Sequence, residues 1–229
     1  MGAVTIEEGL SAAEAALDRG ESLVGTGFWS AVATVKTDGE LVDRYADRIA
    51  VIDQRAFRDW ALLVVPFGTG TLLVSLATVA GLVLIGLAYD LSGLVAVVVF
   101  YLGFLTLLTV SHGLGHVIVG GLMGIRFTSW FIGTIGRPQP GVKVDYSSYL
   151  HVSATGRAWM HASGAIVTKI VPFALIGSAI AAGLPVWAVW VLPVVGVISI
   201  ITDLTWSTKT SDWKKFRREL DLAHTSRSG

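Results

Sequence analysis

The sequence predicts an all-α integral membrane protein with four transmembrane helices and a cytoplasmic loop that contains a short β segment. Composition is the first reason: 53% of the 229 residues are hydrophobic and 15% are charged, whereas soluble domains carry about 25% charged residues. The second reason is that residues 60–88 and 91–125 contain no Asp, Glu, Lys or Arg. The third is that the basic residues outside the apolar segments all fall on one side of the predicted membrane.

The first region of the chain, residues 1–59, is polar and is predicted to be cytoplasmic. Apolar residues at helical spacing predict a short amphipathic helix over 7–19, which Gly20 would end. A second charged segment, 40–59, mixes apolar and charged side chains, and we interpret it as an interfacial or cytosolic helix that leads to the membrane. The alternative is a solvated region without an activity of its own.

The central region, residues 60–206, is predicted to be one transmembrane domain. A helix needs about 20 predominantly apolar residues to cross a bilayer, and four segments meet that requirement. Lys169 and Pro172 interrupt the third of them. The predicted spans are 60–88, 92–124, 158–183 and 185–206.

Basic residues outside the spans predict the orientation of the chain. Four spans place the N-terminal region, the loop 126–157 and the basic tail 207–229 on one side, and these hold six, four and six Lys and Arg residues. The turns on the opposite side hold none. The positive-inside rule therefore predicts a protein of the cell membrane with both termini in the cytoplasm. Within the loop, alternating apolar and polar residues over 142–146 predict a short strand.

Composition also excludes several kinds of site. The sequence contains no cysteine, which excludes disulfides, thiolate zinc sites and iron–sulfur clusters. A formal net charge of +0 gives no support for a nucleic-acid partner. The lipid bilayer is the partner that the sequence predicts directly. Small residues in the spans favour helix association without fixing an oligomeric state.

Two histidines stand four residues apart near the end of the second predicted span. Residues i and i+4 of a helix share a face, with Cβ atoms about 5–6 Å apart, so the rings of His112 and His116 can bind one zinc ion. An ionisable residue inside a span is a functional candidate because burying it in lipid is costly. The structural alternative is that both histidines pack helices together through hydrogen bonds.

Two further residues are predicted to lie in the same layer as these histidines. At about 1.5 Å per helical residue, His161 lies near the cytoplasmic end of the third span and Asp203 near that of the fourth. Two histidines, one carboxylate and an open fourth position form a common catalytic zinc set. Asp203 is therefore a predicted ligand, with His161 as a further candidate. Alternatively, His161 is an interfacial histidine, and Asp203 pairs with Lys169 or Lys209.

The segment His112-Gly-Leu-Gly-His116 gives the chain a resemblance to a known family. It looks like the H-E-x-G-H segment of the site-2 protease family of intramembrane zinc metalloproteases, with the same glycine before the second histidine and an aspartate on a later helix. The resemblance covers about residues 92–213, although Leu204 follows Asp203 where that family usually has Asp-Gly. It implies zinc bound by His112, His116 and Asp203, and membrane-spanning segments of other proteins as substrates or partners.

The departure from that family lies at position 113. The family's glutamate takes a proton from the attacking water and passes it to the leaving amine, but this chain has Gly113 there. No glutamate lies between Glu40 and Glu219, so none within the predicted spans can replace it. Asp145 in the cytoplasmic loop is the candidate base in its place. Its structural alternative is a solvated carboxylate, or one at the end of a strand.

The leading hypothesis is a site-2-protease-like membrane protein, a degenerate or atypical zinc metallopeptidase that acts on or binds membrane protein segments. The strand over 142–146 would offer such a segment an edge for pairing. A second version is an active hydrolase that uses a different base. The alternative from another class is a small polytopic transporter or channel in which His161, Lys169 and Asp203 line a polar path. Haem ligation by histidines on different helices is a third hypothesis.

Overall fold

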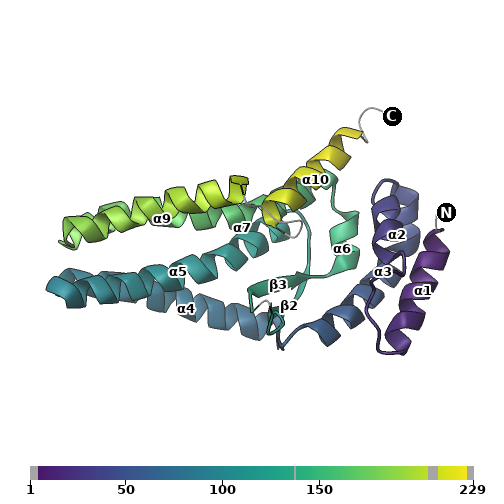
Figure 1. Cartoon of the computed structure of the whole chain (residues 1–229), viewed down its shortest axis with the longest axis horizontal. Coiled ribbons are helices and arrows are strands. Elements are labelled where there is room, and N and C mark those ends of the chain that lie inside the picture. The colour runs from purple at the N-terminus through teal and green to yellow at the C-terminus, as the bar shows by residue number, and fades with distance from the viewer. Residues whose placement is uncertain (1–4, 137, 206–210, 226–229) are drawn as a thin grey trace.

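The computed structural model describes residues 5–136, 138–205 and 211–225. Long apolar helices lie side by side at one end of the molecule, and the remaining helices gather with a small sheet at the other end (Figure 1). We call the first part the apolar bundle, and it consists of α4 (Phe67–Leu87), the 3-10 turn η1 (Ala88–Asp90), α5 (Gly93–Leu122), α7 (Ala154–Ala174), α8 (Ile176–Ala181) and α9 (Val186–Thr205). We call the second part the polar end, and it consists of α1 (Ile6–Asp18), α2 (Phe28–Val35), α3 (Gly39–Trp60), β1 (Leu63–Pro66), β2 (Phe127–Ile132), β3 (Pro140–Val144), α6 (Tyr146–His151) and α10 (Asp212–Thr225).

Local signals start and end the helices of the N-terminal unit, by which we mean α1 to α3 (residues 5–60). Thr5 and Glu8 cap α1 reciprocally: the Glu8 amide donates to the Thr5 hydroxyl at 3.2 Å, and the Thr5 amide donates to the Glu8 carboxylate at 2.9 Å. Gly20, just after α1, has a φ of +73°, a left-handed conformation that glycine adopts without strain. The chain can therefore turn back at this point and pack α2 and α3 against α1.

The N-terminal unit is built around a hydrophobic core to which α6 and α7 also contribute, through Tyr149 and Met160. Leu10 of α1, Phe28 of α2 and Ile49 of α3 are each fully buried in it. The predicted helices over 7–19 and 40–59 are confirmed as α1 and α3. Helix α2 was not predicted, because its eight residues are too few to show a clear period. The region is thus a packed helical unit.

Four helical segments of the described chain are long and apolar enough to cross a membrane. The prediction of four such segments is confirmed, with different bounds. The first begins at Phe67 and not at residue 60, because residues 63–66 pair with β2. Residue 206, where the predicted fourth span ends, lies outside the described residues. The segments are Phe67–Asp90, Gly93–Leu122, Ala154–Ala181 and Val186–Thr205.

The third apolar segment differs most from its prediction. Helix α7 begins at Ala154 and not at residue 158, and it ends at Ala174. Pro172 lies just before this end, and proline lacks the N–H that would continue the backbone hydrogen bonds of the helix. A second short helix, α8, then continues from Ile176. The predicted interruption of this segment is therefore present, at Leu175 and not at the proline itself.

Close approaches between backbones hold the apolar bundle together. A Cβ atom at Gly103 of α5 would lie 2.7 Å from the carbonyl oxygen of Gly81 on α4. A Cβ atom at Gly115 would lie 3.0 Å from the carbonyl oxygen of Ser163 on α7. Glycine permits these approaches, as it does between helices in membranes. Helix α5 is therefore packed tightly against α4 on one side and α7 on the other.

A small antiparallel sheet, in the order β1-β2-β3, lies beside the end of the bundle that faces the N-terminal unit (Figure 1). The strand predicted over 142–146 is present as β3, and its Val142 lies opposite Trp130 of β2. Strand β1 was not predicted, since residues 63–66 were assigned to the first span. The described chain is thus mainly helical with a three-stranded sheet, which has two strands more than the single short strand that the sequence predicted.

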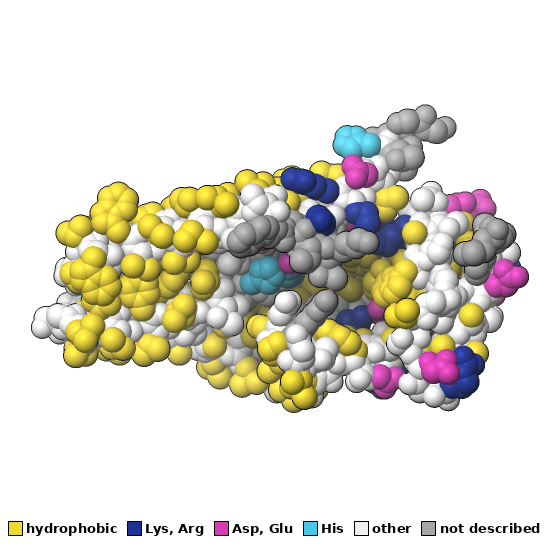
Figure 2. Space-filling model, viewed as in Figure 1, with side chains coloured by type: hydrophobic (Ala, Val, Ile, Leu, Met, Phe, Trp, Pro, Cys, Tyr) yellow, Lys and Arg dark blue, Asp and Glu magenta, His cyan; other side chains and the backbone are white. Residues whose placement is uncertain are grey.

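The surfaces of the two parts differ in composition. Apolar side chains cover the bundle, and charged side chains gather at the polar end (Figure 2). Leu72 of α4, Leu94 of α5 and Trp187 of α9 are 60%, 71% and 59% exposed. A continuous apolar surface of this kind is unusual on a protein that is surrounded by water.

Candidate metal centre

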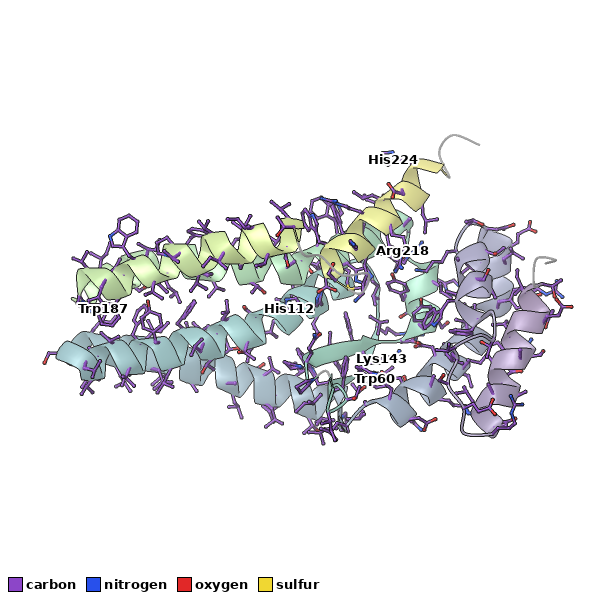
Figure 3. The ribbon with its side chains drawn as sticks, viewed as in Figure 1. Trp60, His112, Lys143, Trp187, Arg218 and His224 are labelled. Carbon is purple, nitrogen blue, oxygen red and sulfur yellow. The ribbon has the colours of Figure 1, made fainter. Side chains whose placement is uncertain are left out.

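His112 and His116 lie one turn apart on α5, and their rings meet, as their spacing predicts. Their Nε2 atoms are 3.2 Å apart. Figure 3 shows His112 on α5 close to the first turn of α10. A glycine on α7 makes room for the rings, because a Cβ atom at Gly164 would lie 2.4 Å from Nε2 of His116. The tight packing of α5 on α7 therefore shapes the site.

Each histidine is oriented through its Nδ1 atom. Nδ1 of His116 lies 2.7 Å from the carbonyl oxygen of Met160, which can only accept a hydrogen bond, so this Nδ1 carries the hydrogen. Nδ1 of His112 lies 3.1 Å from the hydroxyl oxygen of Thr168, whose own hydrogen is donated to the Gly164 carbonyl at 2.8 Å. Nδ1 of His112 is therefore the donor as well. In the neutral rings, both Nε2 atoms carry lone pairs and face each other.

The carboxylate that meets the histidines comes from α10. Asp212 is the first residue of that helix. Its Oδ2 atom lies 3.1 Å from Nε2 of His112 and 3.3 Å from Nε2 of His116. One ligand atom from each of the three residues lies within 4.8 Å of the other two, so this group could hold a metal ion. We call these three residues the His–His–Asp group.

Asp212 is ionised in this setting. The Lys215 ammonium lies 3.2 Å from its Oδ1 atom and favours the negative charge. The carboxylate therefore keeps its negative charge beside the two rings at neutral pH.

His161, the further candidate ligand, borders this group. Its Nδ1 is 4.0 Å from Oδ1 of Asp212, and its Nε2 is 2.9 Å from the Tyr149 hydroxyl. The ring therefore contacts the carboxylate oxygen that faces away from the two other histidines. Its predicted place in the histidine layer is confirmed, and its role as a ligand stays a prediction.

Asp203, the predicted third ligand, contacts a lysine and not the histidines. Its Oδ2 is paired with Nζ of Lys169, which also donates to the Ala165 carbonyl at 3.2 Å. The reason is electrostatic, since a lysine in an apolar bundle needs a nearby negative charge. The place beside the histidines belongs to Asp212, in a segment that the sequence interpretation treated only as a polar tail. Lys209, the other proposed partner of Asp203, lies outside the described residues.

Asp145, the candidate base, has structural contacts. It caps α6 by accepting a hydrogen bond from the Ser147 amide at 3.3 Å, and it pairs with Arg126 at 2.9 Å. It does not belong to the described residues that line the cavity beside the histidines. The alternative interpretation, a carboxylate at the end of a strand, agrees with these contacts.

A cavity of about 880 Å³ opens beside the His–His–Asp group. Its walls come from α3, α5, α7, α9, α10, β2 and β3. The Lys169–Asp203 pair also faces this space, so the cavity contains both a metal-ligating group and an ion pair. A ligand that entered the cavity would meet the open side of the His–His–Asp group.

An indole ring fills the space beside Gly113. A Cβ atom at Gly113 would lie 2.4 Å from Cζ3 of Trp130, and a Cβ atom at Gly70 of α4 would lie 2.4 Å from Cδ1 of the same ring. Nε1 of Trp130 donates to the Thr71 hydroxyl at 3.1 Å. The ring is held between α4 and α5, and position 113 has no room for a longer side chain.

Asp212 is the functional candidate that sequence reasoning missed. A signal was present in the tail, where Asp212, Lys215 and Glu219 stand at helical spacing and share one face. Ser211, just before them, is a residue type that often starts a helix. A helix face that carries several charged residues is ordinarily exposed to solvent. The spacing therefore did not predict a contact between Asp212 and the histidines. The packing of α10 against α7 makes that connection.

Comparison with known proteins adds no family to these observations. The chain matches no protein family, no curated protein and no solved structure. The resemblance to the site-2 protease family therefore depends on the residues of the chain itself.

Proposed function

We propose that this chain is an integral membrane protein that binds a divalent metal ion, with zinc as the first candidate, through His112, His116 and Asp212. We further propose that it is a site-2-protease-like protein without peptidase activity. One observation carries the proposal: three acceptor atoms meet at one point. The two Nε2 lone pairs and the ionised Oδ2 of Asp212 are 3.1 to 3.3 Å apart. Electron-rich atoms at such distances repel one another unless a cation lies among them.

A metal ion satisfies this group better than protons do. A proton on one Nε2 atom bridges one pair of atoms and leaves the third acceptor unmatched. Protons on both rings would place two positive charges 3.2 Å apart. A single divalent ion attracts all three atoms. The hydrogen bonds from the Nδ1 atoms to Met160 and Thr168 are of the kind that orients metal-bound histidines.

The dimensions of the group fit zinc. With bonds of about 2.0–2.2 Å at tetrahedral angles, zinc ligands are about 3.3–3.6 Å apart. The three separations here, 3.1 to 3.3 Å, lie close to that value. Two histidines and one carboxylate leave a fourth position for a ligand, at which bound zinc would act as a Lewis acid.

The surface of the apolar bundle supports membrane insertion. Its four apolar segments are long enough for a hydrocarbon core of about 30 Å, and their outward side chains are mostly apolar (Figure 2). The N-terminal unit, the sheet and α10 lie together at one end of the bundle (Figure 1). All basic residues except Lys169 belong to the N-terminal region, the loop or the tail, so this end is the cytoplasmic one.

The absence of peptidase activity is inferred from position 113. Hydrolysis of the site-2-protease type needs a general base there. Gly113 has no side chain to supply one, and Trp130 occupies the space that a longer side chain would need. Asp145 pairs with Arg126 and does not belong to the described lining of the cavity. The site would therefore bind a ligand without cleaving it.

The cavity indicates a membrane segment of another protein as the partner. Pro140 and Val142 of β3 line it together with the histidines. In the described sheet, β3 is an edge strand, and an extended segment could add to that edge by strand pairing. Such pairing would bring the segment alongside the open side of the His–His–Asp group.

Zinc content of matched variants tests the metal site. The protein is purified in detergent without a histidine tag, equilibrated with zinc and desalted. About one zinc per chain is expected in the wild type, none in the double variant His112→Ala/His116→Ala, and a reduced amount in Asp212→Asn, which keeps both histidines. Asp203→Asn is the matched control, because it changes the carboxylate that pairs with Lys169. It should retain zinc.

Two results would overturn this assignment. Loss of zinc from Asp203→Asn, with zinc retained by Asp212→Asn, would return the ligand role to the aspartate that the resemblance implies. A folded wild-type protein that takes up no metal would remove the metal site altogether. The transporter hypothesis, with Lys169 and Asp203 in a polar path, would then be the better one.

A second experiment tests the loss of hydrolysis. Gly113→Glu alone should stay inactive, because the new side chain collides with Trp130. Gly113→Glu combined with Trp130→Ala supplies both the base and the space for it. We expect cleavage of a single-span reporter protein by this double variant and not by the wild type. Cleavage by the wild type would show that another base operates.

The orientation can be tested cleanly because the chain has no cysteine of its own. Ser22, between α1 and α2, and Ser92, in the turn before α5, are both exposed. A membrane-impermeant thiol reagent added to intact cells should label Ser92→Cys and leave Ser22→Cys unlabelled. The reverse pattern would invert the proposed topology.

A further inference from the structure

Glu219 of α10 is a fully buried acid that three groups from other elements hold. Nζ of Lys36 lies 2.5 Å from its Oε1, and Nε of Arg157 lies 2.6 Å from its Oε2. The Tyr149 hydroxyl donates to Oε1 at 3.1 Å. Burial opposes the charge of Glu219, but Lys36 and Arg157 outweigh burial and hold its pKa below the ordinary value. Charge-assisted bonds of this kind make Glu219 a strong point of attachment for α10.

Glu219 and Asp212 lie on the same face of α10. They are seven residues apart, which is close to two helical turns, or about 10 Å along the axis. Because an intact helix is stiff over that length, the position of Glu219 sets the position of Asp212. Lys215 lies between them on this face and reaches Oδ1 of Asp212 at 3.2 Å.

Side chains outside α10 also connect the two acids. The Tyr149 hydroxyl that contacts Glu219 lies 2.9 Å from Nε2 of His161. Nδ1 of His161 is in turn 4.0 Å from Oδ1 of Asp212. The Asp212 oxygen that faces away from the other two histidines is thus bordered by His161 and Lys215. These contacts direct Oδ2 toward the metal-ligating rings.

Lys36 brings the N-terminal unit into this arrangement. It directly follows α2, and its side chain is 7% exposed. Its Nζ lies 4.8 Å from the centre of the Tyr149 ring as well as beside Glu219. A movement of the N-terminal unit away from α10 would withdraw one of the three donors of Glu219.

We infer that Glu219 is the positioning residue of the metal site and that the N-terminal unit regulates the site through Lys36. The inference rests on the metal binding proposed above and adds its regulation. Docking of the N-terminal unit stabilises α10 where Asp212 completes the ligand set. Displacement of the unit lowers metal affinity although no ligand is changed.

Zinc affinity of three variants, measured on the full chain by competition with a chelator, tests this inference. Glu219→Gln should weaken zinc binding by about 10- to 100-fold, as loss of a group that orients a ligand does. Lys36→Met should weaken it by a smaller factor. The matched control is Arg48→Met, which removes ion pairs between α3 and α1 inside the N-terminal unit and leaves Lys36 and α10 untouched. It should leave zinc affinity unchanged.

Two readouts separate positioning from general destabilisation. In an Asp212→Asn background, Glu219→Gln should cause no further loss of the remaining zinc affinity, because its effect passes through Asp212. In the metal-free protein, backbone amide exchange over 212–224 should rise in Glu219→Gln and in Lys36→Met but not in the control. Glu219→Gln removes a buried charge and can impair folding. If this variant does not fold, the zinc affinity of Lys36→Met decides the outcome.

The outcomes distinguish this inference from the proposal on which it rests. Zinc binding by the wild type with unchanged affinity in both Glu219→Gln and Lys36→Met would overturn the inference and leave the metal site intact. An additive loss in the Asp212→Asn background would overturn the positioning role. Failure of the wild type to bind zinc would overturn the metal site and the inference together.

Discussion

The N-terminal unit and the apolar bundle are both rich in apolar side chains but place them differently. In the N-terminal unit, Leu10, Phe28 and Ile49 are fully buried. In the bundle, large side chains such as Leu94 and Trp187 point outward, while glycines and a smaller set of large side chains, such as Phe100, lie between the helices. The hydrophobic effect in water stabilises the first arrangement. Close backbone packing and polar pairs stabilise the second, because lipid is as apolar as the side chains it surrounds.

The His–His–Asp group lies where these two arrangements meet. Helix α5 of the bundle supplies both histidines, and α10 of the polar end supplies the aspartate. A substitution should therefore act according to the part in which it lies. Pairs of matched variants, one in each environment, can break or sharpen this comparison.

The largest effect is expected in the core of the N-terminal unit. Phe28→Ala should lower the free energy of unfolding by about 3–5 kcal/mol, because it leaves a cavity in a buried core. Leu72→Ala, on the outer face of α4, should cost less than about 1 kcal/mol, since detergent or lipid fills the space. Thermal unfolding in one detergent, followed by circular dichroism, measures both. Equal losses would mean that the face of α4 is covered by protein.

The next effect concerns ion pairs in the two environments. Lys169→Met should cost about 2–3 kcal/mol, because it leaves the charge of Asp203 in the apolar bundle. Arg55→Met, which breaks an exposed pair with Asp18, should cost less than about 1 kcal/mol. The double variant Lys169→Met/Asp203→Asn should recover most of the loss. If it does not, Lys169 stabilises the bundle by something other than charge.

Glycine packing should have a smaller effect on stability and a clear effect on the site. Gly164→Ala places a Cβ atom 2.4 Å from Nε2 of His116 and should cost about 1–3 kcal/mol by overpacking, with reduced zinc uptake. Gly177→Ala is the control, because a Cβ atom there meets no atom within 4 Å among the described residues. Normal zinc uptake by Gly164→Ala would show that α5 and α7 can separate without disturbing the histidines.

The smallest effect is a dependence on pH at the junction of α10 and the N-terminal unit. Since the pKa of folded Glu219 lies below its ordinary value of 4.5, its charge stabilises the folded state above that pH. This contribution should be lost as the pH falls through the folded-state pKa. Amide exchange of α10 in the metal-free protein, divided by the intrinsic exchange rate at each pH, should therefore rise on acidification, and it should rise less steeply in Glu219→Gln. An identical pH profile in both proteins would remove Glu219 as the cause.

The sequence predicted the parts of the fold that depend on composition and local period. Uninterrupted apolar runs identify helices α4, α5 and α9, and the spacing of apolar residues identifies α1 and α3. The sheet was mostly missed, because the four residues of β1 look like the start of an apolar span. Their pairing with β2, far along the chain, depends on tertiary contact and leaves no local signal.

The candidate site divides in the same way. The sequence by itself determined that His112 and His116 share one face of a helix, because that follows from the four-residue spacing and the helical period. It could not decide which aspartate meets them, because Asp203 and Asp212 are both near enough in sequence to the end of the last apolar helix. The tertiary structure pairs Asp203 with Lys169 and, through the attachment of α10, brings Asp212 to the histidines. Charge pairing and helix packing between segments that are far apart in the sequence decide which aspartate meets the histidines. The local pattern of residues does not reveal such contacts.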